Sequence, residues 1–149
     1  MTGRSRREVL ALGAAGAVLA LARGAAQATP QEAAAAIAEF TGGKPTAPGK
    51  IAIDLPEIAE NGNTVPLSVT VESPMTAEDY VSDILVIAEA NPRPKIVTFQ
   101  LTPMCARADV ATRIRLAATQ DVTVVAKTSK GQFITAKKAV KVTVGGCGG

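Results

Sequence analysis

The residue of this chain best suited to covalent chemistry is Cys147, which lies between two pairs of glycines in the segment GGCGG, residues 145–149. Glycine has more backbone freedom than any other residue, so it does not hold a neighbouring side chain in a fixed catalytic position. The chain also has no histidine that would activate the thiol as a base. We therefore expect a passive attachment point on a flexible arm, with the chemistry done by a partner enzyme. The arm glycines are Gly145, Gly146, Gly148 and Gly149.

This arm is expected to lie outside the folded domain and to be thin enough to enter a narrow channel in another protein. A β-branched residue in the arm would restrict its backbone and add bulk. On this interpretation, Gly146→Val blocks enzymatic loading of Cys147 but leaves the stability of the domain unchanged.

Other interpretations of Cys147 stay open at this point. A structural disulfide with Cys105 is permitted in an oxidising compartment and would contribute about 2–4 kcal/mol. Four flanking glycines, however, do not hold a cysteine at the separation that a disulfide needs. Prenylation is disfavoured, because two residues rather than three follow Cys147. A ubiquitin-like carrier also ends in Gly-Gly, but its cytoplasmic chemistry conflicts with an export signal and gives Cys147 no role.

The first 28 residues have the three parts of a bacterial export signal. Arg6 and Arg7 form a twin arginine, an apolar run follows over residues 9–22, and residues 26–28 are the small-residue cleavage pattern AQA. The apolar run is too short and too rich in alanine to serve as a membrane anchor. We expect removal after Ala28 and a periplasmic location by the twin-arginine pathway. The expected domains are the signal 1–28, a helix with a β-sandwich over 29–144, and the arm 145–149.

The composition of the remaining chain argues against several functional classes. The whole chain has 16 Lys+Arg and 13 Asp+Glu, and residues 1–28 contain four of the basic and one of the acidic residues. Twelve of each remain, so the mature protein is formally neutral and is not expected to bind nucleic acid. The lack of histidine removes the usual general base and the usual metal ligand. We expect neither an enzyme nor a metal or cofactor site.

One helix is predicted at the start of the mature chain. Thr29 is a suitable cap, Pro30 suits the first helical position, and Glu32 completes a capping box. Three apolar residues share one helical face, and two glycines end the helix. These residues are Ala33, Ile37 and Phe40, followed by Gly42 and Gly43.

From Ile51 onward the apolar residues alternate with a period of two, which is typical of strands. On the strand predicted over residues 64–73, one face is formed by Val65, Leu67, Val69 and Val71. About seven short β-branched strands separated by turns predict an antiparallel, immunoglobulin-like β-sandwich. The predicted strands span residues 64–73, 80–90, 95–101, 111–117, 122–129, 132–138 and 139–144, with an edge strand at 50–56.

Four features together resemble the SoxY family, the sulfur-carrier subunit of the bacterial thiosulfate-oxidising system. They are the terminal GGCGG, the preceding VKVTV, the segment TRIRLAATQDV and the twin-arginine leader. The resemblance implies that Cys147 is the carrier cysteine and that the flanking glycines form a swinging arm. Cys105, in the loop TPMCARAD, corresponds to no family motif. An exported sandwich used for assembly or adhesion, with a structural Cys105–Cys147 disulfide, is the alternative.

The resemblance also implies a set of partners in the periplasm. A SoxZ-like subunit would form a heterodimer with this chain. The haem enzyme SoxAX would join thiosulfate to the cysteine, SoxB would release sulfate, and SoxCD would oxidise the remaining sulfur where it is present. Two arginines are candidates to face an anionic intermediate or the partner subunit, although such alternating charges more often form a solvated strand face. Three lysines near the arm are candidates to attract sulfur oxyanions, and a solvated edge strand explains them equally well. The two arginines are Arg113 and Arg115, and the three lysines are Lys137, Lys138 and Lys141.

Overall fold

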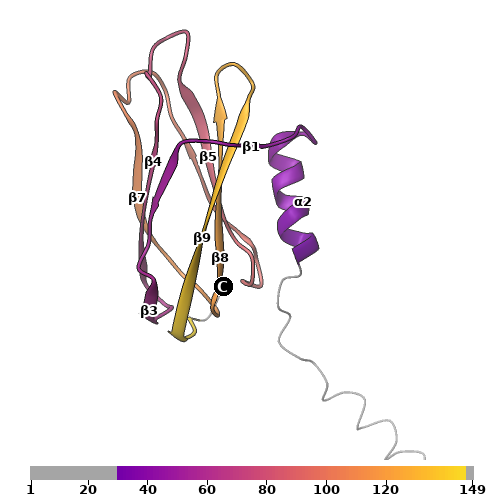
Figure 1. The fold of residues 1–149 in the computed structure, drawn as a ribbon, viewed down its shortest axis with the longest axis vertical. Helices are drawn as coiled ribbons and strands as arrows, with labels where there is room; N and C mark the ends of the chain where they lie inside the picture. Colours follow the sequence, from indigo (N-terminus) through magenta and orange to yellow (C-terminus); the bar gives the residue numbers. More distant parts are fainter. Residues whose placement is uncertain (1–29, 147–149) are drawn as a thin grey trace, which may run out of the picture.

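Residues 30–146 are described by a computed structural model, in which two β-sheets face each other and one helix covers the outside of the larger sheet (Figure 1). The larger sheet has the strand order β1-β9-β8-β5-β6, with β3 also paired to β9, and the smaller has the order β2-β4-β7. The elements are α2 (Pro30–Thr41), β1 (Ala47–Pro48), β2 (Ile51–Asp54), β3 (Ile58–Asn61), β4 (Val65–Val71), β5 (Val81–Ala88), β6 (Lys95–Gln100), β7 (Ala108–Ile114), β8 (Gln120–Thr128) and β9 (Phe133–Val144).

The main core lies between the two sheets and follows the predicted alternation. On β4 every second residue is buried, because one side of this strand faces the core and the other faces solvent. The four predicted core residues of β4 are all at most 2% exposed. They pack with apolar residues from β5 and β8, among them Ile84, Val86, Val122 and Val124.

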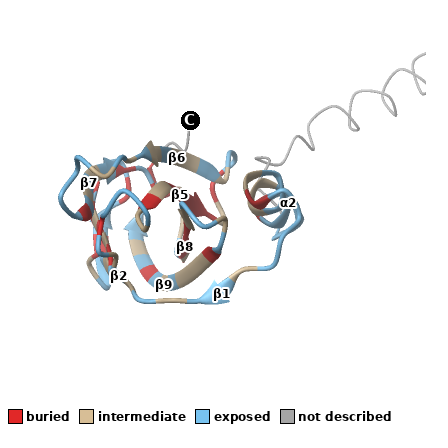
Figure 2. Ribbon diagram, turned by 90° about the horizontal axis from the view of Figure 1, so that it is seen from above, coloured by how far each residue is buried: buried red, intermediate tan, exposed pale blue. Residues whose placement is uncertain are grey.

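The helix explains why β5 and β8 are buried on both sides. Seen from above, α2 lies against the outer side of the larger sheet (Figure 2). Its apolar side packs on residues of β5, β8 and β9, and the rings of Phe40 and Phe133 meet edge to face at 5.9 Å between centroids. The predicted helical face, Ala33, Ile37 and Phe40, is therefore confirmed. Thr29, its predicted cap, lies outside the described residues.

The last strand, β9, differs from the prediction because it is one continuous strand of 12 residues rather than two. No glycine or proline interrupts residues 133–144, so nothing breaks the ladder. Two short strands pair with it in parallel, β1 near its start and β3 near its end, which departs from a purely antiparallel sandwich. The chain thus crosses from the larger sheet to the smaller one at β2 and returns at β3.

An ion-pair network lies on the outer surface of the larger sheet. The Lys137 ammonium is 2.7 Å from a Glu89 carboxylate oxygen and 3.6 Å from Asp121, and the Thr123 hydroxyl donates to Glu89 at 2.9 Å. Partial burial raises the pKa of Glu89, but hydrogen bonds from Lys137 and Thr123 lower it by more, so it lies below its ordinary value of 4.5. The pKa of Lys137 is raised by its hydrogen bond to Glu89.

This network predicts how stability depends on pH. Because the pKa of Glu89 is lower in the folded protein than in the unfolded chain, its stabilisation is present above 4.5 and is lost as the pH falls through the folded value. Lys137→Met should cost about 0.5 kcal/mol at pH 7, since the pair is partly exposed, and should make the loss below pH 4.5 shallower. Urea unfolding at pH 7 and below pH 4.5 measures this, with Lys141→Met as the control on the same strand. Equal pH curves for wild type and Lys137→Met would contradict it.

Candidate functional site

The end of β9 is held by β3 and Gly62 as far as Val144 on one side and by Thr119 at Val142 on the other. On one side β3 pairs with it in parallel, with Asn61 opposite Val144, and the Gly62 amide donates to the Val144 carbonyl at 2.7 Å. On the other side, beyond the last residue pair of β8, the Val142 amide donates to the Thr119 hydroxyl at 2.9 Å. The Thr119 side chain, which directly precedes the start of β8 at Gln120, thus continues the ladder beyond that strand.

The two glycines after β9 are part of this packed end. The Gly146 amide donates to the Leu116 carbonyl at 2.9 Å, and the Leu116 amide donates to the Gly62 carbonyl at 2.8 Å. A Cβ at Gly146 would lie 2.5 Å from the Gly62 carbonyl oxygen, and a Cβ at Gly145 would lie 2.1 Å from that of Ala117. Both contacts are with backbone, which cannot rotate away, so both positions require glycine.

This packing corrects the predicted extent of the flexible arm. Gly145 and Gly146 were expected to be free of the domain, but Gly146 is buried and hydrogen-bonded, and the domain therefore extends to Gly146 rather than to Val144. Sequence reasoning missed this because Gly62, the other glycine of the contact, is more than eighty residues away. Cys147, Gly148 and Gly149 lie outside the described residues, so their role as carrier residue and arm stays a prediction.

A buried pair of amide side chains holds the loop that receives Gly146. Asn91 is 3% exposed and Gln120 is 8% exposed. The Asn91 oxygen accepts hydrogen bonds from the Ala117 amide and from Gln120, both at 2.9 Å, and its nitrogen donates to the Arg115 carbonyl at 2.7 Å. The alternation of apolar residues did not predict this pair, because Asn91 lies in the loop after β5 and Gln120 is the first residue of β8.

Removing the Asn91 side chain should therefore loosen the loop over residues 115–119, whose Leu116 carbonyl accepts the hydrogen bond from Gly146. Asn91→Ala removes one buried hydrogen bond to Gln120 and two partly buried ones to Ala117 and Arg115, and we expect a loss of about 2–3 kcal/mol in the free energy of unfolding. Denaturant unfolding measures it, and Asn61→Ala is the control, because Asn61 is an exposed asparagine with a local hydrogen bond to Asn63. A loss below about 0.5 kcal/mol, the size expected for an exposed residue, would contradict the role given to Asn91.

The other cysteine, Cys105, lies in the loop between β6 and β7 and is exposed. Its amide donates to the Thr102 carbonyl at 2.9 Å in a tight turn. This loop precedes β7, whereas Gly146 contacts Leu116 beyond the other end of β7. The seven residues of β7 span roughly 20 Å, and one residue adds about 3.8 Å beyond Gly146. The fold thus disfavours a Cys105–Cys147 disulfide, which needs a Cα separation of about 6 Å.

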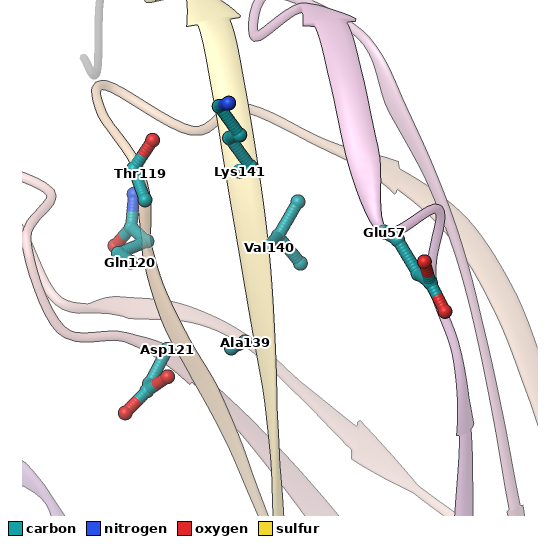
Figure 3. Close-up of a pocket in the computed structure, with 7 residues that line it drawn as sticks. All are labelled: Glu57, Thr119, Gln120, Asp121, Ala139, Val140 and Lys141. Atoms are coloured by element: carbon teal, nitrogen blue, oxygen red, sulfur yellow. The ribbon is translucent and has the colours of Figure 1, made fainter.

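The three lysines near the end of β9 have different surroundings. Lys137 pairs with Glu89, and the Lys138 ammonium donates to the Ile53 carbonyl at 3.3 Å. Lys141 lines a shallow cavity of about 530 Å³ beside the Thr119 loop, with Ala139 and Val140 below it (Figure 3). Lys137 and Lys138 therefore have structural partners, and Arg113 and Arg115 line a different cavity, between β6 and β7.

Within residues 30–146, no three or more histidine, cysteine, aspartate or glutamate side chains are grouped so that they could hold a metal ion. The helix of this region, α2, is not long and apolar enough to cross a membrane.

Comparison with known proteins identifies the fold and the family. The family model for the sulfur oxidation protein SoxY matches residues 37–147. The sulfur carrier protein SoxY from Chlorobium limicola f. thiosulfatophilum is similar in structure, with 32% identity and a TM-score of 0.66, covering 78% of this chain and all of that one. The immunoglobulin-like sandwich predicted from the sequence is thereby confirmed. No curated protein matches the chain.

Superoxide reductases share the fold at lower identity. The neelaredoxin from Ignicoccus hospitalis is 20% identical in two structures. One has a TM-score of 0.57 and covers 64% of this chain and 82% of its own, and the other has a TM-score of 0.56 and covers 62% and 79%. A putative superoxide reductase from Thermotoga maritima is 15% identical with a TM-score of 0.51, covering 69% of this chain and 89% of its own. These likenesses concern the architecture alone. The family model covers most of the chain and reaches Cys147, and the chain belongs to the SoxY family of sulfur oxidation proteins.

Proposed function

We propose that this protein is a periplasmic covalent carrier that holds sulfur intermediates on Cys147 and presents them to the enzymes of the Sox system. The observation that carries the proposal is the fixed end of β9. The backbone is hydrogen-bonded up to Gly146, the residue directly before Cys147, so the point of the domain to which Cys147 is joined is fixed. Family membership and the carrier function of the SoxY from Chlorobium support the same conclusion, and a carrier subunit rather than an enzyme agrees with both.

The proposed chemistry needs nothing from this chain except the thiol. Loading joins the cysteine sulfur to the outer sulfur of thiosulfate, giving Cys–S–S–SO₃⁻ with release of one proton and two electrons, which the haem enzyme SoxAX accepts. Hydrolysis by SoxB then uses one water molecule, releases sulfate and two protons, and leaves a persulfide on the cysteine. SoxCD would oxidise that persulfide further where it is present. A thiol that its own chain does not activate depends on the partner enzyme for oxidative loading with thiosulfate, although it still reacts with small soluble thiol reagents.

Two further proposals concern location and assembly. The twin arginine and the cleavage pattern of residues 1–28 support export to the periplasm, and the resemblance supports a heterodimer with a SoxZ-like subunit. We expect size-exclusion chromatography and native mass spectrometry of the protein from the native periplasm to show a complex with one second small subunit. Consistent recovery of a free monomer would contradict the heterodimer.

Intact-mass analysis of that material tests the carrier function directly. We expect added mass of the thiosulfonate or persulfide adduct when thiosulfate is supplied, and peptide mapping should place the adduct on Cys147. Treatment with a thiol reductant should return the mass to that of the free protein. If the mass never changes during thiosulfate oxidation, the protein is not the carrier, and the assembly or adhesion module becomes the better explanation.

A further inference from the structure

Four basic residues, all exposed, line one open cavity at the edge of the sandwich between β6 and β7. Arg93 and Lys95 come from the start of β6, and Arg113 and Arg115 from the end of β7, and together they line a cavity of about 450 Å³. This volume lies within the usual range of small-ligand sites. The strands β6 and β7 are edge strands of their respective sheets, so the cavity lies at the open side of the sandwich.

The cavity has an excess of positive charge. Its remaining lining residues are Asn91, Ile96 and Ile114, so no carboxylate lines it. Among residues 30–146, no carboxylate lies within ion-pair distance of any of its four cations. Glu32 and Glu39 of α2 line a neighbouring cavity that also includes Arg93 and Lys95, but not Arg113 or Arg115. The β7 side of the cavity is therefore the more positive side.

The cavity adjoins the point where the chain leaves the domain. Arg115, on its wall, directly precedes Leu116, whose carbonyl accepts the hydrogen bond from Gly146. Asn91 connects the cavity with the loop that contacts Gly146, since it lines the cavity and accepts the hydrogen bond from Ala117. Cys147 follows Gly146 directly, at about 3.8 Å between Cα atoms. The described chain thus ends, directly before Cys147, at a residue hydrogen-bonded to the loop that forms one wall of the cavity.

We propose that this cavity binds a tetrahedral sulfur oxyanion, with Arg113 and Arg115 as its main ligands. Guanidinium groups match such anions because they offer two parallel donors. A bound anion would also reduce the repulsion between the neighbouring positive charges that line the cavity. The anion has two possible sources, the sulfonate end of an adduct on Cys147 or a free sulfate or thiosulfate ion. The first source rests on the proposed carrier function, and the second does not.

The binding site is tested first without any adduct. The full mature chain carrying Cys105→Ser and Cys147→Ser is titrated with sulfate and with thiosulfate at constant ionic strength, and NMR follows the backbone and side-chain NH groups of Arg113 and Arg115. We expect saturable shifts that chloride does not cause. Arg113→Gln with Arg115→Gln should weaken binding about tenfold or more, the effect of losing one charge-assisted hydrogen bond. Lys44→Gln with Lys141→Gln is the matched control and should bind as the parent does.

The second arm of the experiment loads Cys147 chemically in the Cys105→Ser chain. The thiolate attacks tetrathionate, thiosulfate leaves, and Cys147 carries the anionic group S–SO₃⁻. A methanethiosulfonate reagent gives the neutral S–CH₃ adduct at the same sulfur, with sulfinate as the leaving group. We expect shifts of the backbone NH groups at positions 113 and 115 with the anionic adduct and none with the neutral one. The same backbone NH groups should not shift in the double glutamine variant that carries the anionic adduct.

The outcomes separate this inference from the carrier proposal. Shifts in the second arm identify the adduct as a ligand, and saturable shifts in the first arm identify the free ion as one. The absence of specific shifts in both arms overturns the oxyanion site, although enzymatic loading of Cys147 would be unaffected. Shifts at these arginines that arise solely when the co-purified partner subunit is added would also overturn it, because the cavity would then be a protein interface.

Discussion

Cys147→Ser is expected to carry no sulfur adduct at all, whereas Cys105→Ser should be loaded at the wild-type rate. A hydroxyl oxygen cannot form the disulfide-type bond to thiosulfate, so the first variant loses the reacting atom itself. Cys105 lies beyond the opposite end of β7, in a turn fixed by Thr102, and has no comparable exit from the domain. Loading by SoxAX, followed by intact mass over time, measures both rates, and the variant lacking both cysteines gives the background.

The same pair of variants decides between the carrier and the structural disulfide. Because the described hydrogen bonds that hold the end of β9 all involve residues before Cys147, we expect thermal melting of Cys147→Ser to match that of wild type. A disulfide would instead contribute about 2–4 kcal/mol and its loss would lower the melting temperature. A large drop for both cysteine variants would restore the disulfide alternative, and a Cys105→Ser protein that cannot be loaded would show that two thiols take part.

The sequence was sufficient for the parts of the fold that depend on local periodicity. The alternation in β4 and the apolar face of α2 predicted which residues face the core, since burial on one side imposes a period of two on a strand and about 3.6 on a helix. The start and end of α2 followed from Pro30 and from two glycines with positive φ, at 62° and 77°.

The short strands and the glycine contacts could not be predicted in this way. β1 and β3 have two and four residues, and each exists because it pairs with β9, more than eighty residues later in the chain. The need for glycine at Gly62 and Gly146 also arises from a contact between distant segments. Gly146 was interpreted as part of a flexible arm because its sequence neighbours are glycines, and a run of glycines looks the same whether it is free or tightly packed.

Two valine substitutions test whether a glycine beside Cys147 is packed or free. One replaces Gly146, before the cysteine, and the other replaces Gly148, after it. At Gly146, a new Cβ would lie 2.5 Å from the Gly62 carbonyl oxygen and 2.8 Å from the Asn63 amide nitrogen, so the end of β9 must shift. We expect Gly146→Val to lower the free energy of unfolding by about 1–3 kcal/mol, the usual cost of overpacking. Gly148→Val adds the same side chain beyond the described contacts and should leave the melting temperature unchanged.

The loading rates of the two variants then show whether loading depends on the packed end of β9 or on a narrow entrance in the partner enzyme. A narrow entrance in SoxAX predicts severe loss of loading for both variants, with ordinary alkylation of Cys147 by a small soluble reagent. If the fixed exit point alone matters, Gly146→Val loses loading and stability together, while Gly148→Val loads normally. A loss of about 1 kcal/mol would lower the melting temperature by roughly 4 °C. If Gly146→Val instead melts at the wild-type temperature, the packed glycines do not hold the end of β9. The earlier expectation of an arm that is free from Gly145 onward would then be correct, because a free chain end accepts a β-branched residue without disturbing the sandwich.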